Sequence, residues 1–116
     1  MAKKVKFLQK PTCTTCRKAK AFLEKMGAEL ELRNLDTERL SEAELDKLIG
    51  AQDHRKFLNT RNEMYRTRKM KDNSPGRAEA IKLMAKNPNL IRRPVVIRGD
   101  EIVLGHDENS LRKLVS

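Results

Sequence analysis

Apolar and polar residues alternate near the start of the chain, at 4–7 and again at 28–33, and this pattern predicts two strands. Between these segments the apolar positions follow helical spacing: Ala19, Phe22, Leu23 and Met26. Because Gly27 follows as a stop signal, we expect a helix from Cys16 to Met26. A strand, a helix and a second strand in this order predict a βαβ unit.

The middle of the chain has helical patterns instead of strand patterns. Ser41 and Glu44 form a capping-box pattern, with Leu40 and Leu45 as a hydrophobic staple. The helix that follows is expected to bury Leu45, Leu48 and Ile49 and to end at Gly50. Segments 53–58 and 62–66 show weaker helical patterns.

A further helix is predicted over 77–86. Ser74 and Pro75 are interpreted as its cap and first-turn proline, and Asn87-Pro88 as its end. The residues expected to face inward are Ala78, Ile81 and Met84 or Ala85. We therefore treat 41–88 as a helical insertion.

The last third of the chain returns to strands. Apolar runs at 95–97 and 102–104 are joined by Arg98-Gly99-Asp100-Glu101, which predicts an antiparallel hairpin, and 107–115 predicts a closing helix. The whole order predicts an α/β fold. It has a mixed sheet of about four strands, and the helical insertion lies between the βαβ unit and the C-terminal hairpin and helix. At 116 residues, we expect a single domain over 1–116.

Two cysteines stand at the turn between the first strand and the first helix, in the sequence Cys13-Thr14-Thr15-Cys16. A thiol at a helix N-terminus faces unpaired amide groups and the positive end of the helix dipole, which favour the thiolate. Cys13 is therefore the candidate nucleophile. Cys16 is close enough in sequence to attack a mixed disulfide on Cys13. A C-x-x-C pair at this position predicts a thioredoxin-like, or glutaredoxin-like, fold.

Two other interpretations of the thiols are half of a zinc site and two inert side chains. Zinc needs about four ligands, and the remaining soft candidates, His54 and His106, are isolated in the sequence. We therefore predict redox chemistry and no metal site.

The formal net charge of +10 favours anionic partners, such as an oxyanion, glutathione, nucleic acid or an acidic protein surface. Aromatic residues are few, and no recognition helix is evident, so direct sequence-specific DNA binding is not expected. No segment suits a signal peptide or a membrane span, and both cysteines lie in one motif. We therefore expect a cytoplasmic protein without membrane partners.

The cysteine motif, Thr60-Arg61, the run from Asn87 to Ile97 and Leu104-Gly105-His106 together resemble the arsenate reductase/Spx family over nearly the whole chain. This resemblance implies a thioredoxin-like fold in which Pro94 is cis and lies against the active-site sulfurs. It also implies that Arg61 and Arg93 hold an oxyanion or stabilise the Cys13 thiolate, because guanidinium pairs with oxyanions and stays charged. Further residues are expected to contact substrate: Thr12, Thr14, Thr15, Arg17, Pro94 and His106.

Three functions are compatible with these residues. The first is a thiol–disulfide oxidoreductase that reduces arsenate or a mixed disulfide, with Cys13 as nucleophile and Cys16 as resolving thiol. By resemblance, no cofactor is bound, and electrons come from glutathione, glutaredoxin or thioredoxin. The second is an Spx-type redox-sensing regulator that binds the RNA polymerase α subunit. The third is a redox-inert binding module.

Overall fold

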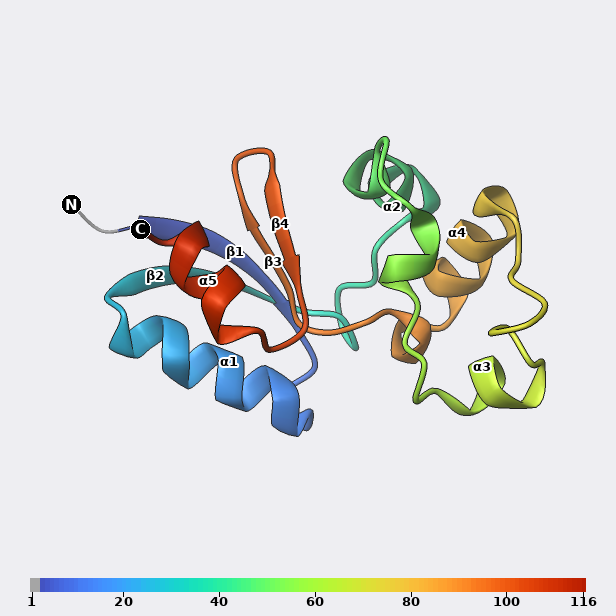
Figure 1. Ribbon diagram of the computed structural model, residues 1–116, viewed down its shortest axis with the longest axis horizontal. Coiled ribbons are helices and arrows are strands. Elements are labelled where there is room, and N and C mark those ends of the chain that lie inside the picture. Colours follow the sequence, from blue (N-terminus) through green and yellow to red (C-terminus); the bar gives the residue numbers. More distant parts are fainter. Residues whose placement is uncertain (1–2) are drawn as a thin grey trace. The chain divides into compact units, whose positions relative to one another are not determined.

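The computed structural model describes residues 3–116 and divides into two compact units. One unit comprises the chain up to Glu38 together with Arg93–Ser116, and the other comprises Arg39–Arg92. The first unit contains all four strands and therefore the predicted redox turn (Figure 1).

The sheet has the strand order β2-β1-β3-β4. Strands β1 (Lys3–Gln9) and β2 (Ala28–Asn34) are parallel and are joined by helix α1 (Thr14–Lys25). Strand β3 (Val95–Arg98) pairs antiparallel with both β1 and β4 (Glu101–Leu104), and helix α5 (Glu108–Leu114) follows. The structure confirms the predicted α/β fold with its mixed four-stranded sheet, and the first strand is longer than 4–7 at both ends.

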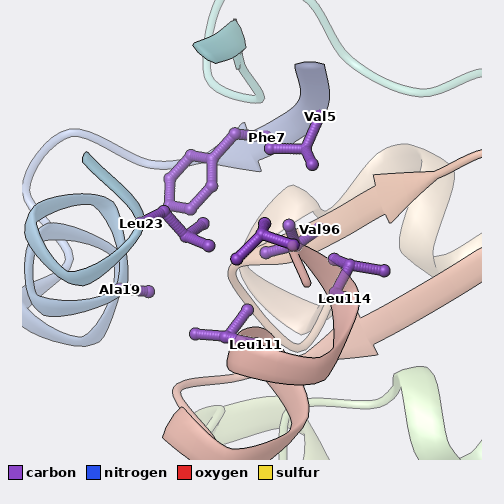
Figure 2. Packing of buried hydrophobic residues seen from close by; sticks show 8 residues of the cluster. Val5, Phe7, Ala19, Leu23, Val96, Leu111 and Leu114 are labelled. Atoms are coloured by element: carbon purple, nitrogen blue, oxygen red, sulfur yellow. The ribbon is translucent and has the colours of Figure 1, made fainter. Parts of the chain in front are cut away.

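Helices α1 and α5 share one core with one face of the sheet (Figure 2). The buried cluster consists of Val5, Phe7, Ala19, Leu23, Val96, Leu111, Leu114 and Val115. The parallel register pairs Val5 with Leu30, and the antiparallel register pairs Phe7 with Val96, so side chains from neighbouring strands meet on this face. This packing fixes α1, and with it the cysteine turn, against the sheet.

Helices make up most of the second unit. Helix α2 (Glu42–Ile49) begins with the predicted capping box, in which Glu44 N–H donates to the Ser41 hydroxyl at 3.1 Å and Ser41 N–H donates to the Glu44 carboxylate at 3.1 Å. Helix α4 (Arg77–Lys86) contacts α2, and Arg77 forms an ion pair with Asp46 at 2.6 Å. The remaining elements are short: η1 (His54–Phe57), α3 (Glu63–Thr67) and η2 (Pro88–Leu90).

Two sequence predictions about α4 are wrong. The helix begins after Gly76, and the Ser74 hydroxyl donates instead to the Met70 carbonyl at 3.0 Å, in the preceding turn. The Pro75 carbonyl bonds to His54 Nε2 at 2.9 Å, outside the helix. Ala78 is exposed, because the buried face of α4 consists of Ala80, Ile81 and Met84.

The buried stripe of α1 also ends earlier than predicted. Met26 is the residue that caps the helix C-terminus and is 37% exposed, whereas Leu23 is fully buried. Gly27 then takes a positive φ of 83°, as its stop role requires. The turn to β2 therefore directs Met26 away from the core.

Candidate active site

Cys13 caps the N-terminus of α1. Its backbone is extended, with φ −79° and ψ 119°, and its sulfur accepts the Cys16 amide at 3.4 Å. The Cys13 amide donates to the Lys10 carbonyl at 2.9 Å, which closes a tight turn with Pro11 at its second position. Proline is favoured at this position of a turn, so Pro11 is a sequence signal for the loop that positions the thiol.

The surroundings of Cys13 favour its thiolate. Partial burial alone would raise the pKa of this thiol, but hydrogen bonds from Cys16, the positive charge of Arg93 and the Thr15 amide together lower the pKa below its usual value. Cys13 is half-buried, so the sulfur combines a stabilised charge with access from solvent.

Cys16 has the opposite character. It is fully buried on the core side of α1, and this burial, with the neighbouring Cys13 thiolate, raises the pKa of Cys16 to about 12. The Lys10 backbone and the Arg93 charge act in the opposite direction, and each lowers the pKa of Cys16 by less than burial raises it. Both cysteines are free thiols, so the structure is the dithiol form. One thiol is thus ready to attack while its neighbour stays protonated.

Arg93 and Pro94 reach the cysteine turn from the far end of the chain. The Arg93–Pro94 peptide bond is cis, as the family resemblance implied, and Pro94 is buried just ahead of β3. The Gly105 amide donates to the Pro94 carbonyl at 2.9 Å, which ties this segment to the end of β4. The Arg93 charge lowers the pKa of Cys13, so the structure brings Arg93 into electrostatic range of the thiol.

His106 packs on α1 through an aromatic contact. Its ring lies edge-on to Phe22, with 6.2 Å between ring centroids, and its Nε2 is 3.5 Å from the Glu108 carboxylate. Arg112 covers the same phenyl ring at 5.7 Å. This cluster could not be predicted from the sequence, since it depends on α5 packing beside α1. A substrate contact by His106 stays a prediction.

Four of the other predicted site residues lie at the cysteine turn, and the fifth lies in the second unit. Thr12, Thr14 and Arg17 are exposed around the cysteine turn, and Thr15 is half-buried with its amide directed at Cys13. Arg61 lies in the second unit, where its amide donates to the Asn59 side chain at 3.1 Å and the residue is exposed. The proposed substrate roles of these five residues stay predictions.

Within residues 3–116, no group of three or more His, Cys, Asp or Glu residues is arranged to hold a metal ion. Among the same residues, no helix has the length and apolar character needed to cross a membrane.

The fold and the site together define a class of protein. A mixed sheet with a dithiol at the β1–α1 turn and a cis-proline ahead of β3 is a thioredoxin-like arrangement. The profile of the ArsC family matches residues 8–114. The chain belongs to the ArsC family.

Individual relatives agree with this assignment. The chain is 31% identical over 111 residues to the global transcriptional regulator Spx of Streptococcus pyogenes, covering 91% of this chain and 81% of the relative. The crystal structure of an ArsC family related protein from Bacteroides fragilis is similar with a TM-score of 0.84 and 31% identity, over 96% of this chain and 98% of the other. An arsenate reductase from Vibrio cholerae has the same fold, with a TM-score of 0.84 at 23% identity over 98% and 99% of the two chains.

The two thiols are expected to differ in their reaction with iodoacetamide. Since only thiolate is alkylated, Cys13 should be labelled at pH values below the usual thiol pKa, and its rate should fall as the pH drops through its lowered pKa. Cys16 should stay unlabelled in the folded protein, because its pKa is about 12 and it is buried. Peptide mapping after labelling at a series of pH values measures both rates, and labelling of Cys16 first would reverse the assigned roles.

Proposed function

We propose that this protein is a thiol–disulfide oxidoreductase, with Cys13 as nucleophile and Cys16 as resolving thiol. The observation that carries the proposal is the contrast between the two sulfurs within one turn of α1. Cys13 is accessible, with a lowered pKa, and Cys16 is buried with a pKa of about 12. A thiolate beside a protonated thiol suits attack by the first and release by the second.

In the first step the Cys13 thiolate attacks one sulfur of a disulfide substrate. A Cys13–substrate disulfide forms, the substrate's own S–S bond breaks, and the second substrate sulfur leaves as a thiolate that takes a proton from solvent. The negative charge on Cys13 disappears in this step. The part of the pKa rise of Cys16 that comes from the Cys13 thiolate disappears with it, so the resolving thiol becomes easier to deprotonate only after Cys13 has reacted.

In the second step the Cys16 thiol loses its proton and attacks the Cys13 sulfur. The Cys13–Cys16 disulfide forms, the bond from Cys13 to the substrate breaks, and the substrate leaves as a thiol. Two electrons have then passed from the dithiol to the substrate. Two thiols of an external donor reduce the Cys13–Cys16 disulfide and complete the cycle. Glutathione, a glutaredoxin or a thioredoxin is the proposed donor class.

An oxyanion such as arsenate is the proposed alternative substrate. Cys13 would displace hydroxide from arsenic(V), and attack by Cys16 on the Cys13 sulfur would release arsenic(III) while the same intramolecular disulfide forms. The Arg93 charge near Cys13 supports an anionic substrate, because guanidinium pairs with oxyanions. We assign contacts with the anion at the cysteine turn to Thr12, Thr14, Thr15 and Arg17. An anion-binding role of Arg61, which lies in the second unit, stays a prediction.

Coupled reductase assays test the proposed function. The full chain should reduce a small mixed disulfide, with glutathione and glutaredoxin as the donor system, and Cys13→Ser should abolish this activity. Arsenate is assayed in parallel with the same donors. No turnover above the Cys13→Ser background with either substrate would refute the oxidoreductase assignment.

Arg93→Ala is expected to impair reduction of anionic substrates more than reduction of neutral disulfides. The loss of one charge-assisted contact corresponds to about 1.5–3 kcal/mol of transition-state binding for an anion. The variant should also raise the pKa of Cys13, because the charge that stabilises the thiolate is gone. The measurements are kcat/KM for both substrate classes and the pH profile of Cys13 alkylation.

Arg92→Ala is the matched control for this variant. Arg92 is the neighbouring residue, is exposed, and has its amide bonded to the Phe57 carbonyl in the second unit. It should leave both kcat/KM values and the alkylation profile nearly unchanged. Equal losses for anionic and neutral substrates in Arg93→Ala would assign Arg93 a structural role instead.

A redox-sensing regulator is the second candidate function. The observation that favours it is the 31% identity to the regulator Spx, which covers most of both chains. In this case, formation of the Cys13–Cys16 disulfide is itself the signal, and the partner proposed is the RNA polymerase α subunit. A pull-down with the α subunit, using reduced and oxidised protein, distinguishes the two functions, since only a sensor should change its affinity on oxidation.

A further inference from the structure

A hollow of about 540 Å³ lies within the second unit, and no residue of the cysteine turn lines it. We call it the basic hollow and define it by its lining residues: Thr60, Tyr65, Arg66, Lys69, Lys71 and Asp72. Three of these side chains are cations and one is a carboxylate. The net positive charge and the open space together favour an anion as occupant.

The three cations of the basic hollow are not neutralised by protein groups. Among residues 3–116, Arg66, Lys69 and Lys71 have no carboxylate within the 4.0 Å of a salt bridge. Three positive charges that line one space repel one another, Asp72 offsets only part of this repulsion, and a bound anion reduces the rest. Because the hollow has three cations, a ligand with several negative charges fits it better than a ligand with one.

The backbone at Lys69 positions these charges. Lys69 has a φ of 51°, in the left-handed region, and it is the one described non-glycine residue in 3–116 with a positive φ. Its amide donates to the Arg66 carbonyl at 3.1 Å, and its carbonyl accepts the Asp72 and Asn73 amides at 3.1 and 2.8 Å. This turn reverses the chain after α3 and directs it back past Tyr65. A lysine in a conformation that favours glycine is compatible with a role for its side chain.

We propose that the basic hollow binds the oligophosphate group of a small molecule. Arg66, Lys69 and Lys71 pair with phosphate oxygens, since guanidinium and ammonium groups both donate to phosphate. The Thr60 hydroxyl donates a further hydrogen bond. Tyr65 offers an aromatic face, on which a base stacks when the oligophosphate belongs to a nucleotide. None of the lining residues takes part in the proposed thiol chemistry, so the two proposals do not depend on each other.

Titration of the full chain with sodium tripolyphosphate tests the proposal. Tyr65 is the single tyrosine and the chain has no tryptophan, so a change in tyrosine fluorescence reports on this hollow alone. We expect a saturable change and one site by isothermal titration calorimetry, weakened by added NaCl. ATP is measured by calorimetry, and tighter binding of ATP than of tripolyphosphate would identify a nucleotide, whereas equal binding would identify the phosphate chain alone as the recognised group.

Two variants remove charge without disturbing the fold. Lys71→Ala should weaken tripolyphosphate binding about tenfold, as expected for one lost contact to a charged group. Lys69→Gly should do the same, and glycine adopts the positive φ at this position freely, so the turn is kept. Lys82→Ala removes one charge from an exposed position on α4 outside the hollow and should leave affinity unchanged. The rate of Cys13 alkylation should be the same in all three variants.

Three outcomes would overturn the proposal. The first is no saturable signal up to about 10 mM tripolyphosphate, which is weaker than ordinary small-ligand binding. The second is equal weakening by Lys71→Ala and Lys82→Ala, which would indicate general surface charge. The third is binding of a single-stranded oligonucleotide that tripolyphosphate and ATP fail to displace, which would assign the surface to nucleic acid instead.

Discussion

Cys16→Ser should convert the protein into a stable mixed disulfide on Cys13 when it is exposed to oxidised glutathione. Cys13 keeps its position at the α1 cap and its access to solvent, so the first attack proceeds. The second attack cannot occur, because serine does not supply a thiolate. Disulfide reduction should fall by at least about 100-fold, since a neighbouring thiol acts with effective molarities of about 10⁵–10⁸ M that a free thiol cannot match.

Mass spectrometry of the intact protein and of its peptides measures this trapping. Wild-type protein should release glutathione and form the Cys13–Cys16 disulfide, whereas Cys16→Ser should carry one glutathione on Cys13. Cys13→Ser is the control, because it lacks the nucleophile and should acquire no adduct on the buried Cys16. Unimpaired turnover by Cys16→Ser without any adduct would show that one cysteine suffices and that Cys16 does not resolve.

Leu23→Ala should lower the free energy of unfolding by about 2–5 kcal/mol. Leu23 is fully buried in the cluster formed by α1, α5 and the sheet, and truncation leaves a cavity that the close-packed neighbours fill only in part. Urea denaturation followed by circular dichroism gives the overall loss. The rate of Cys16 labelling under native conditions reports the loss in the first unit, because this buried thiol reacts only when the structure around it opens.

Met26→Ala is the matched control for this stability experiment. Both substitutions truncate a side chain of similar size at the same helix, but Met26 is 37% exposed at the cap. The expected change for Met26→Ala is within about 0.5 kcal/mol. Similar losses from both variants would show that Leu23 does not anchor α1 as the packing indicates.

The order of strands and helices could be predicted because it depends on local periodicity. Alternation specified β1 and β2, and the Ser41 and Glu44 pair specified the start of α2, since the two residues satisfy each other's backbone within one turn. Predictions failed where local signals competed. Ser74 has the properties of a helix cap, yet its hydroxyl donates to the Met70 carbonyl, since serine side chains also bond to backbone groups of the preceding turn.

The site could be predicted in part for the same reason. The stabilised thiolate of Cys13 could be predicted, because it depends on the position of this residue at a helix N-terminus, and the helix is evident from the sequence. The raised pKa of Cys16 depends on burial against the sheet, and the cluster of Phe22, His106 and Arg112 depends on α5 lying beside α1. Neither follows from spacing along the chain, because both result from packing between distant segments.

The split of the sheet between two distant parts of the chain affects how the protein is made. During synthesis β1, α1 and β2 emerge before residues 39–92, and β3 emerges only after them. At about 5–20 residues per second, the side of β1 that pairs with β3 stays open on the ribosome for on the order of several seconds. During this period the nascent chain contains Cys13 but not yet Arg93. The charge of Arg93 therefore does not lower the pKa of the Cys13 thiol until residue 93 has been added.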